Sequence, residues 1–299
     1  CVAQGKESGA AIGGQTQDLA PADGVMYALR DVTATVDSIP LIAASVMCKK
    51  IAAGANLIIL DVKCGAGAFM DTREKAVQLA ETLVEVGKRL KRPVSAVVTD
   101  MEQPLGNAVG HTLEVIEAIE TLRGKGPEDL QELCYALGAL AIITAGKATD
   151  EAAARAILQE TITSGRALEK FKQLVQRQGG NVAAIDDYAL MPTAALKVDF
   201  SAPSGSGPLW IEHLNGRAVA EACKLMGAGR SKKGDPIDLG VGVVLHKKTG
   251  GKVAPGQAVA TVYAQSQAQA DLALAKLSEA IKFSSSSVET PALIKAKVL

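Results

Sequence analysis

The stretch "ANLIILDVKCGAGAF" at residues 55–69 decides the fold of this 299-residue chain. Its apolar run, rich in β-branched residues, predicts a buried parallel strand whose carboxyl end lies at Asp61 and Lys63, before a glycine-rich turn. Residues 71–91 have the pattern of an amphipathic helix, and residues 92–102, "RPVSAVVTDME", predict a second strand. Strand, helix and strand in this order form a βαβ unit, so we expect an α/β fold in which helices flank a sheet.

The carboxyl ends of the two predicted strands carry polar residues and glycines. Ligands of α/β folds gather at this edge of the sheet, and the residues that fall there are Asp61, Lys63, Gly65, Gly67 and Asp100. For the two aspartates, a structural role in helix capping or turn formation is as compatible with the sequence as a role in a ligand site. Both interpretations stay open at this point.

The segment that precedes the first strand is "YALRDVTATVDSIPLIAASVMCKK", residues 27–50. Pro40 indicates the start of a helix, and Gly54 occupies the position that a helix C-cap favours. Ser45 and Lys49 are four residues apart, which places them on one face of that helix. The face would present a hydroxyl and an ammonium group together.

A uracil or thymine ring presents two carbonyl acceptors on either side of one N–H donor. Arg30 and Lys49 can supply the donors, and the hydroxyl of Ser45 can accept. The two cations would also stabilise the anion that forms when the base leaves a sugar. A purely structural role is the alternative: Ser45 bonds to a backbone carbonyl, Lys49 and Lys50 form a solvated helix end, and Arg30 pairs with Asp31.

Composition narrows the class of protein. Lys plus Arg equals Asp plus Glu at 32 each, so no overall field attracts nucleic acid or an anionic membrane. The five cysteines form no C-x-x-C motif, which argues against a disulfide framework or a zinc site. The longest apolar runs are about half the length of a membrane-spanning helix. We therefore expect a soluble, cytoplasmic protein without nucleic-acid or membrane partners.

The predicted secondary structure of the remaining chain changes near residue 190. Residues 107–178 read as helices with Gly or Asp between them, whereas residues after 190 contain turns and short strands, with helices at 216–227 and about 266–282. The predicted organisation is an incomplete α/β domain at 1–21 and 53–190, a segment of a helical domain at 22–52, and a β-rich C-terminal α+β domain at 191–299.

Four stretches carry a resemblance that touches nearly the whole chain. They are residues 14–55, which contain the segment above, "LDVKCGAGAFM" at 60–70, "TDMEQPLGNAVGHTLEV" at 99–115 and "LMGAGRSKKGDPIDLGVGVVLHKKTG" at 225–250. The chain resembles the thymidine and pyrimidine-nucleoside phosphorylases at these residues. The resemblance implies that the residues that hold the base and act in catalysis are Arg30, Ser45 and Lys49, and that those lining its pocket are Tyr27, Ile42, Val46 and Phe69.

The resemblance also implies an activity and an assembly. The reaction is reversible phosphorolysis, in which a pyrimidine nucleoside and phosphate as co-substrate give a free base and a pentose 1-phosphate, with no cofactor required. The enzymes of this family are homodimers whose helical domain closes on a larger α/β domain. Some members bind a structural cation through two carbonyls and a glutamate, which match Leu105, Ala108 and Glu117.

The sequence departs from the family in one respect. The family's phosphate site is a glycine-rich loop with Lys, His, Ser and Thr, and no such motif occurs here. The stretches "CGAGAF" and "GAGRSKKGD" offer amides and cations without matching that loop. His111, His213 and His246 do not match its histidine, so we expect each to be structural or exposed. Because Cys1 rather than Met opens the chain, we also expect an N-terminal portion to be missing.

Three other interpretations stay open. The chain could be a fragment or shortened relative that assembles or binds pyrimidines without turnover, so whether it acts as an enzyme is undecided. A phosphoribosyltransferase would share the fold but needs a pyrophosphate and magnesium site. A biotin or lipoyl carrier would display a modified lysine, and Lys247 and Lys248 precede a glycine turn without the usual surrounding motif.

Overall fold

The computed structural model describes residues 5, 7, 9–14, 19–205, 207–230, 232 and 234–299. The chain divides into two compact units. The first unit comprises Cys1–Asp100, Glu132–Ser164 and Leu293–Leu299, and the second comprises Met101–Gln131 and Gly165–Ala292. Each unit is described by itself below.

The sheet of the first unit contains the predicted βαβ motif. Strand β1 (Ile58–Cys64) runs parallel to β2 (Val94–Asp100), and helix α4 (Arg73–Arg89) connects them. Every residue of β2 is buried, whereas burial alternates along β1. A third strand, β10 (Ile294–Val298), pairs antiparallel with β2, so the strand order is β1-β2-β10. The predicted strands and their parallel pairing are confirmed.

Helix α4 packs closely on this sheet. Its N-cap is Thr72, whose side chain accepts a hydrogen bond from the backbone N–H of Lys75. Near its other end, a Cβ atom added to Gly87 would lie 2.2 Å from Cγ2 of Val94. Glycine therefore permits the helix to approach the first residue of β2. The helix contributes the buried residues Ala76, Leu79, Ala80, Leu83 and Val84, of which each leucine or valine side chain is worth about 1.5–3 kcal/mol.

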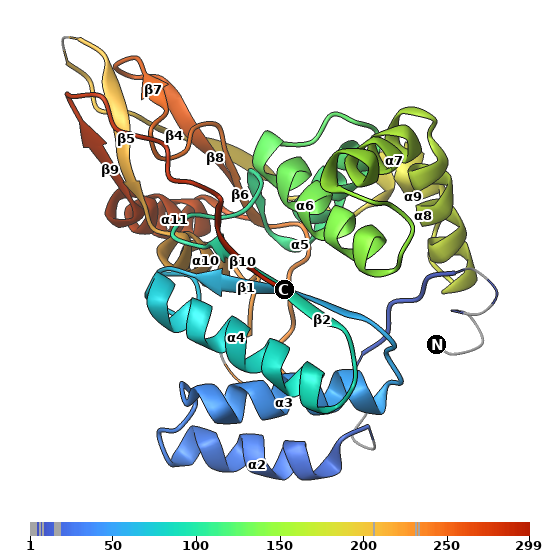
Figure 1. Ribbon diagram of the computed structural model, residues 1–299. Coiled ribbons are helices and arrows are strands. Elements are labelled where there is room, and N and C mark those ends of the chain that lie inside the picture. Colours follow the sequence, from blue (N-terminus) through green and yellow to red (C-terminus); the bar gives the residue numbers. More distant parts are fainter. Residues whose placement is uncertain are drawn as a thin grey trace. The chain divides into compact units, whose positions relative to one another are not determined.

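Two further helices precede the sheet in the sequence. They are α2 (Pro21–Val32) and α3 (Ile39–Ala52), and α3 lies between α2 and α4 (Figure 1). Ala43 and Met47 of α3 are almost fully buried in the core of the first unit. Gly54, with φ of +79°, follows the end of the helix as expected. The predicted helix from Pro40 is thus confirmed, with its start one residue earlier.

The rest of the first unit is helical. Helix α6 (Glu128–Thr144) belongs to this unit from Glu132 onward, and α7 (Glu151–Thr163) follows it. Arg155 of α7 donates to both carboxylate oxygens of Glu132, at 2.8 and 2.7 Å. Lys297 of β10 lies 2.7 Å from Glu151. These ion pairs connect the two helices with each other and with the C-terminal strand.

The second unit contains two antiparallel sheets. One has the order β3-β6-β8-β4, formed by Ala108–Val109, Gly242–Leu245, Ala258–Ala264 and Leu196–Ser201. The other has the order β7-β5-β9, formed by Lys252–Val253, Leu209–Leu214 and Ile281–Ser284. The adjoining helices are α10 (Gly216–Leu225) and α11 (Gln267–Ala280), which confirm the two predicted C-terminal helices.

The core of the second unit draws on both sheets and both helices. Its fully buried members include Ile211, Leu214, Val219, Met226, Leu245 and Leu277. The same unit contains helices α5 (His111–Leu122), α8 (Arg166–Arg177) and α9 (Ala183–Asp186), followed by the 3₁₀ turn η1 (Tyr188–Leu190). The fold is therefore α/β with a β-rich α+β part, as the sequence predicts.

The compact units group three segments differently from the predicted domains. Residues Met101–Gln131 and those from Gly165 to 190 group with the β-rich part, and Leu293–Leu299 group with the first unit. Strand pairing between distant segments accounts for two of these groupings, because β3, within Met101–Gln131, pairs with β6, and β10, within Leu293–Leu299, pairs with β2. The separate helical-domain segment at 22–52 stays a prediction.

Two other expectations concern the chain as a whole. Among the described residues, Cys48, Cys64, Cys134 and Cys223 form no disulfide bond, whereas Cys1 lies outside them. Within the part of the chain that the structure describes, no helix is long and apolar enough to span a membrane.

Candidate functional site

The predicted base-binding face is formed by helix α3. Ser38 is extended just before the helix, and Pro40 lies in its first turn. One helical turn separates Ser45 from Lys49, and the ammonium nitrogen of Lys49 donates to Oγ of Ser45 at 3.1 Å. Ser45 is buried, with 8% of its surface exposed. The expected juxtaposition of hydroxyl and ammonium is thus confirmed.

A third member of this cluster, Asp23, comes from helix α2. Its Oδ2 lies 2.8 Å from Nζ of Lys49, and its side chain is only 10% exposed. Burial alone would raise the pKa of Asp23, but hydrogen bonds from Lys49 and Ser45 and the charges of Lys49 and Arg30 lower it below its ordinary value. Asp23 therefore holds a negative charge between two helices, and Lys49 is no solvated helix end.

Sequence reasoning missed Asp23, although a signal was present. Asp23, Tyr27 and Arg30 are spaced at i, i+4 and i+7, so they share one face of α2. A carboxylate on the same face as a predicted base-binding arginine is a natural partner for the second predicted cation. Asp23 also fits the first turn of a helix, where acidic residues are common, so spacing alone does not distinguish a charge partner of Lys49 from a residue that stabilises the helix end.

Arg30 has backbone partners. Only 5% of its surface is exposed, and its guanidinium donates to the carbonyls of Thr35 and Leu41 at 3.4 Å each and to that of Val36. The guanidinium carbon also lies 5.4 Å from the centre of the Tyr27 ring. Arg30 thus ties together the turn between α2 and α3 while keeping a positive charge near Asp23.

The four residues predicted to line the base pocket fall into two groups. Ile42 and Val46 of α3 are partly buried and pack against the core of the first unit. Tyr27 and Phe69 are exposed by 49% and 69% of their surface. Each group could serve a base differently, the first as an apolar wall and the second as a stacking surface. Their role as pocket lining stays a prediction.

The carboxyl ends of β1 and β2 carry ion pairs. Asp61 accepts from Oγ1 of Thr99 at 2.5 Å and lies 2.5 Å from the ammonium of Lys63. Asp100, 5% exposed, lies 2.9 Å from the ammonium of Lys295 in an ion pair without a well-aligned hydrogen bond. Cations of the first unit therefore balance both aspartates, which favours a charge-pairing role for them over helix capping.

The residues predicted to bind a cation lie in the second unit. Glu117 accepts hydrogen bonds from the backbone N–H groups of Asn107 and Ala108, at 2.8 and 3.1 Å. Burial raises the pKa of Glu117 above its ordinary value, which these hydrogen bonds and the charge of Lys248 offset only in part. Ala108 and Glu117 line a cavity of about 760 Å³, whereas Leu105 does not.

Lys248, which lies near Glu117, bears on two predictions: the carrier-domain alternative and the cation site. Lys248 donates to the carbonyl of Pro104 at 2.8 Å and to the carboxylate of Asp129. A lysine held in this way is not displayed at a hairpin tip, which counts against the carrier-domain alternative at Lys248. Among the described residues, no group of three or more His, Cys, Asp and Glu side chains is arranged to hold a metal. The cation site at Leu105, Ala108 and Glu117 stays a prediction.

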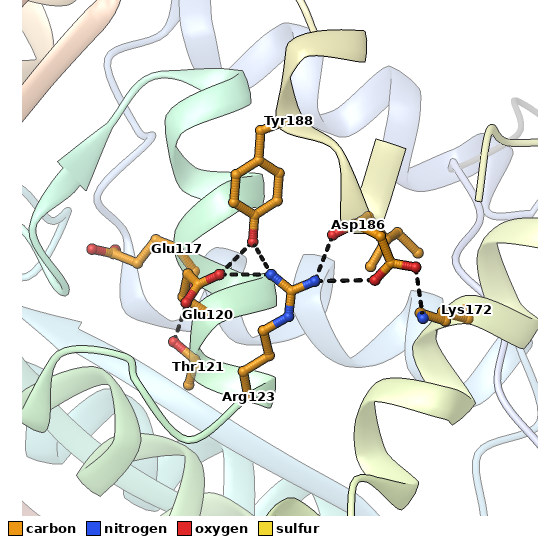
Figure 2. A network of polar contacts seen from close by, with 8 residues as sticks. Glu117, Glu120, Thr121, Arg123, Lys172, Asp186 and Tyr188 are labelled. Carbon is orange, nitrogen blue, oxygen red and sulfur yellow. Dashed lines mark hydrogen bonds and ion pairs between the residues drawn. The ribbon is translucent and has the colours of Figure 1, made fainter. Parts of the chain in front are cut away.

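A polar network borders the same cavity (Figure 2). Arg123 donates to Glu120 at 2.8 Å, to the Tyr188 hydroxyl at 2.7 Å and to Asp186 at 3.1 Å. Lys172 of α8 lies 2.8 Å from the other oxygen of Asp186. The network joins α5, α8, α9 and η1, and only its Glu120–Arg123 pair has a local spacing that sequence could have indicated.

The three histidines have no common site. His111 bonds to the carbonyl of Ala228 at 3.0 Å, and His246 bonds to Oγ1 of Thr261 at 2.8 Å. His111, His213 and His246 are all exposed. This agrees with the expectation that each is structural or exposed. Of the two glycine-rich stretches, "GAGRSKKGD" contains Ser231 and Lys233, which lie outside the described residues.

Two family models match the chain. The model described as "Glycosyl transferase family, a/b domain" matches residues 3–168. The model described as "Pyrimidine nucleoside phosphorylase C-terminal domain" matches residues 210–284. The first match covers more than half of the chain. It includes the neighbouring polar residues of α2 and α3, namely Asp23, Arg30, Ser45 and Lys49.

Three curated relatives bear the name pyrimidine-nucleoside phosphorylase. The protein of Bacillus subtilis (strain 168) is 47% identical over 284 residues, which are 95% of this chain and 64% of the relative. That of Staphylococcus haemolyticus (strain JCSC1435) is 46% identical over 288 residues, or 96% and 65%. That of Geobacillus stearothermophilus is 45% identical over 288 residues, or 96% and 66%. The chain thus spans slightly less than two thirds of the length of these relatives.

Proposed function

The chain belongs to the glycosyl transferase family whose a/b domain its residues 3–168 match, and we propose that it acts in the phosphorolysis of pyrimidine nucleosides. In this reaction an oxygen of inorganic phosphate bonds to C1′ of the pentose while the bond from C1′ to the base nitrogen breaks. The electron pair of that bond goes to the base, which leaves as an anion and then takes up a proton. The products are a free pyrimidine and a pentose 1-phosphate.

The observation that carries the proposal is the contact between Lys49 and Ser45. The buried hydroxyl of Ser45 and the ammonium of Lys49 lie 3.1 Å apart and offer an acceptor beside a donor. This pair complements the adjacent N–H and carbonyl groups of a uracil or thymine ring. The names of the relatives point to the same class of substrate.

Arg30 has a supporting role in this proposal. Its guanidinium has five N–H donors, and the carbonyls of Thr35, Val36 and Leu41 take three of them. We assign the others to the second carbonyl of the base. Arg30 and Lys49 together place two positive charges where negative charge develops on the leaving base, and such preorganised charge is the largest contribution in many enzymes.

The proposal also covers the co-substrate, a structural cation, the cellular location and the oligomeric state. Phosphate is the co-substrate, and no organic cofactor takes part. A structural cation bound by Glu117 and the carbonyls of Leu105 and Ala108 would neutralise a carboxylate whose pKa burial raises. We further propose a cytoplasmic homodimer, with the exposed residues Tyr27 and Phe69 of the first unit turned toward the base.

The test is phosphorolysis of uridine and thymidine by this polypeptide, with release of the free base followed by absorbance. We expect turnover that requires phosphate, and a loss of at least about a hundredfold in kcat/KM for Lys49→Ala. Lys50→Ala is the matched control, because it removes a neighbouring cation from the same helix end. Equal rates for both variants would refute the base-site assignment.

A folded protein without turnover would leave the second candidate function, binding without catalysis. What favours this candidate is that the 299 residues contain no match to the family's glycine-rich phosphate motif. Titration of the protein with uracil and thymine, followed by calorimetry, separates the two functions. Binding of a base by folded, inactive protein would support binding without catalysis.

A further inference from the structure

We propose that the cavity beside helix α5 binds a small molecule with an apolar body and one carboxylate group, which the Thr112 hydroxyl and the Lys197 ammonium hold. The cavity has a volume of about 760 Å³, within the range of small-molecule sites. All of its lining residues belong to the second unit, whereas the residues of the proposed base site belong to the first. This ligand is therefore independent of the phosphorolysis proposed above.

One buried hydroxyl on the cavity wall has no partner. Thr112, the second residue of α5, is 7% exposed and lines the cavity. Its hydroxyl makes no hydrogen bond within the part of the chain that the structure describes. In other helices, or later in α5, the hydroxyls of Thr82, Thr121 and Thr144 donate to the carbonyl four residues earlier, at 2.7 Å.

The position of Thr112 explains the difference. The residue four positions before it is Ala108, which belongs to strand β3, so no helical carbonyl is available to the hydroxyl. Burial of a polar group without a partner is unfavourable, and such groups are uncommon in folded proteins. The Thr112 hydroxyl therefore indicates a polar group of a ligand inside the cavity.

Two further free donors lie on the four-stranded sheet of the second unit. Tyr263 of β8 is opposite Lys197 of β4 and opposite Gly242 of β6. Opposite residues of an antiparallel pair share one face of the sheet, and Lys197 and Tyr263 both line the cavity. The ammonium of Lys197 lies 5.2 Å from the centre of the Tyr263 ring. Among the described residues, the ammonium has no acidic partner and the phenol hydroxyl no hydrogen bond.

These donors gather near the N-terminal end of α5. A Cβ atom added to Gly242 would lie 2.8 Å from Cδ1 of Leu113, so the first turn of the helix reaches the sheet at this glycine. Thr112 precedes Leu113, and Tyr263 is the strand partner of Gly242. The N-terminus of a helix carries a partial positive charge, which adds to the charge of Lys197. This end of the cavity is therefore suited to an anionic group.

The acidic residues of the lining are paired, hydrogen-bonded or exposed. Glu120 is paired with Arg123 at 2.8 Å, as Figure 2 shows. Glu117 accepts hydrogen bonds from two backbone N–H groups, and Glu128 is exposed to water. Lys125, a second lysine of the lining, has no acidic partner in the described ranges. A ligand anion can therefore interact with lysines that no carboxylate of the protein already neutralises.

The apolar part of the lining determines the body of the ligand. Leu113 and Ile116 of α5 and Val244 of β6 line the cavity. Contact with these side chains favours an aromatic or branched hydrocarbon group, which a phosphate ion or a sugar lacks. In a hydrocarbon carboxylate, the oxygens can accept from Thr112 and Lys197 while the body covers the apolar wall. This combination defines the class of ligand.

The experiment is a calorimetric titration at neutral pH with phenylacetate, phenylacetamide and phenethylamine. The three compounds share a phenyl ring and carry a negative charge, no charge and a positive charge. We expect phenylacetate to bind at least about tenfold more tightly than the other two, because charge-assisted hydrogen bonds are stronger than neutral ones. No binding of phenylacetate to wild type, or tighter binding of the amide or the amine, would overturn the proposal.

Two substitutions assign the contacts. Thr112→Val removes the hydroxyl at similar volume, and Lys197→Met removes the ammonium but keeps an apolar chain. We expect each to weaken phenylacetate by about tenfold. Lys252→Met is the matched control, because Lys252 lies 5.6 Å from the centre of the Trp210 ring and outside the cavity lining. Thr121→Val is the corresponding control on α5. Both controls should bind phenylacetate as wild type does.

The ratio of the affinities for phenylacetate and phenylacetamide separates a contact from a distortion. A variant that only distorts the cavity weakens both compounds equally, whereas Lys197→Met should weaken the carboxylate alone. If Thr112→Val does not fold, Tyr263→Phe replaces it, and an unchanged ratio in this variant and in Lys197→Met would overturn the proposal. None of these measurements needs catalytic turnover, so a failure of the proposed function would not affect them.

Discussion

The hydroxyl oxygen of Tyr188 lies 2.5 Å from Oε1 of Glu120, although 68 positions separate the two residues in the sequence. The hydroxyl donates to the carboxylate, and it accepts from Arg123 at 2.7 Å. Burial and the hydrogen bond to Glu120 raise the pKa of Tyr188 to about 12. This contact ties the turn η1 to helix α5 at the wall of the cavity (Figure 2).

Replacement of this tyrosine should lower stability. Tyr188→Phe removes a charge-assisted hydrogen bond to Glu120 and leaves one donor of Arg123 unpaired, so we expect a loss of about 1–3 kcal/mol in the free energy of unfolding. Urea unfolding at neutral pH measures it. Tyr135→Phe, a change of the same kind in α6, serves as the control and should cost less than about 0.5 kcal/mol. Similar losses in the two variants would contradict a stabilising role for the hydrogen bonds of the Tyr188 hydroxyl.

Tyr188 should also give the protein a specific alkaline sensitivity. Its pKa rises from 10.0 to about 12 on folding, so the folded state binds the phenolic proton more tightly than the unfolded state. The stabilisation is complete below pH 10 and is lost as the pH rises from 10 to about 12. Ultraviolet titration of the tyrosines should show a late transition that is absent from Tyr188→Phe. Identical titration curves for wild type and Tyr188→Phe would contradict the raised pKa of Tyr188.

Glu117 should make stability fall as the pH rises from acidic values. Burial raises the pKa of Glu117 above 4.5, so the folded state binds its proton more tightly than the unfolded state does. Stability is therefore highest when Glu117 is protonated and decreases as the pH rises from 4.5 through the higher pKa of the folded state.

Removal of this carboxyl group should remove that decrease. The free energy of unfolding of Glu117→Gln, measured in urea from about pH 4 to about pH 8, should rise relative to wild type as the pH rises. Glu81→Gln, at an exposed position of α4, should follow wild type throughout. If the difference between Glu117→Gln and wild type were constant with pH, the raised pKa would be disproved.

Two glycine substitutions should have opposite effects. A Cβ on Gly87 would lie 2.2 Å from Cγ2 of Val94 and 2.9 Å from the carbonyl of Arg92. We expect Gly87→Ala to destabilise the protein by about 1–3 kcal/mol, because overpacking outweighs the gain in helix propensity. A Cβ on Gly24 of α2 would meet no atom within 4 Å, so Gly24→Ala should stabilise by about 0.5–1 kcal/mol. Thermal unfolding of both variants compares them directly.

Local periodicity explains what could be predicted of the fold. The apolar runs before Asp61 and Asp100, with an amphipathic helix between them, determine two parallel strands because a short crossover helix permits little else. The partners of β2 and β3 were harder to predict. Strand β10 reaches β2 from the far end of the chain, and β3 comprises only Ala108 and Val109. Neither pairing has a local pattern.

In the candidate site, too, one contact follows from local spacing and the others depend on how distant residues pack. The contact of Ser45 with Lys49 follows from helical spacing, so the sequence alone was sufficient to predict it. The ion pair of Asp23 with Lys49 depends on how α2 packs on α3. The three carbonyls around Arg30 depend on the path of the turn between these helices. Spacing along the chain carries no information on either arrangement.

The sequence by itself therefore determined the βαβ unit, the helix that begins near Pro40 and the face shared by Ser45 and Lys49. All of these arise from interactions between residues close together in the chain. Tertiary structure decided that Asp23 neutralises Lys49, that Arg30 is buried against carbonyls and that Tyr188 bonds to Glu120. These contacts form because packing brings distant polar groups out of water together, where each must find a partner to offset its desolvation.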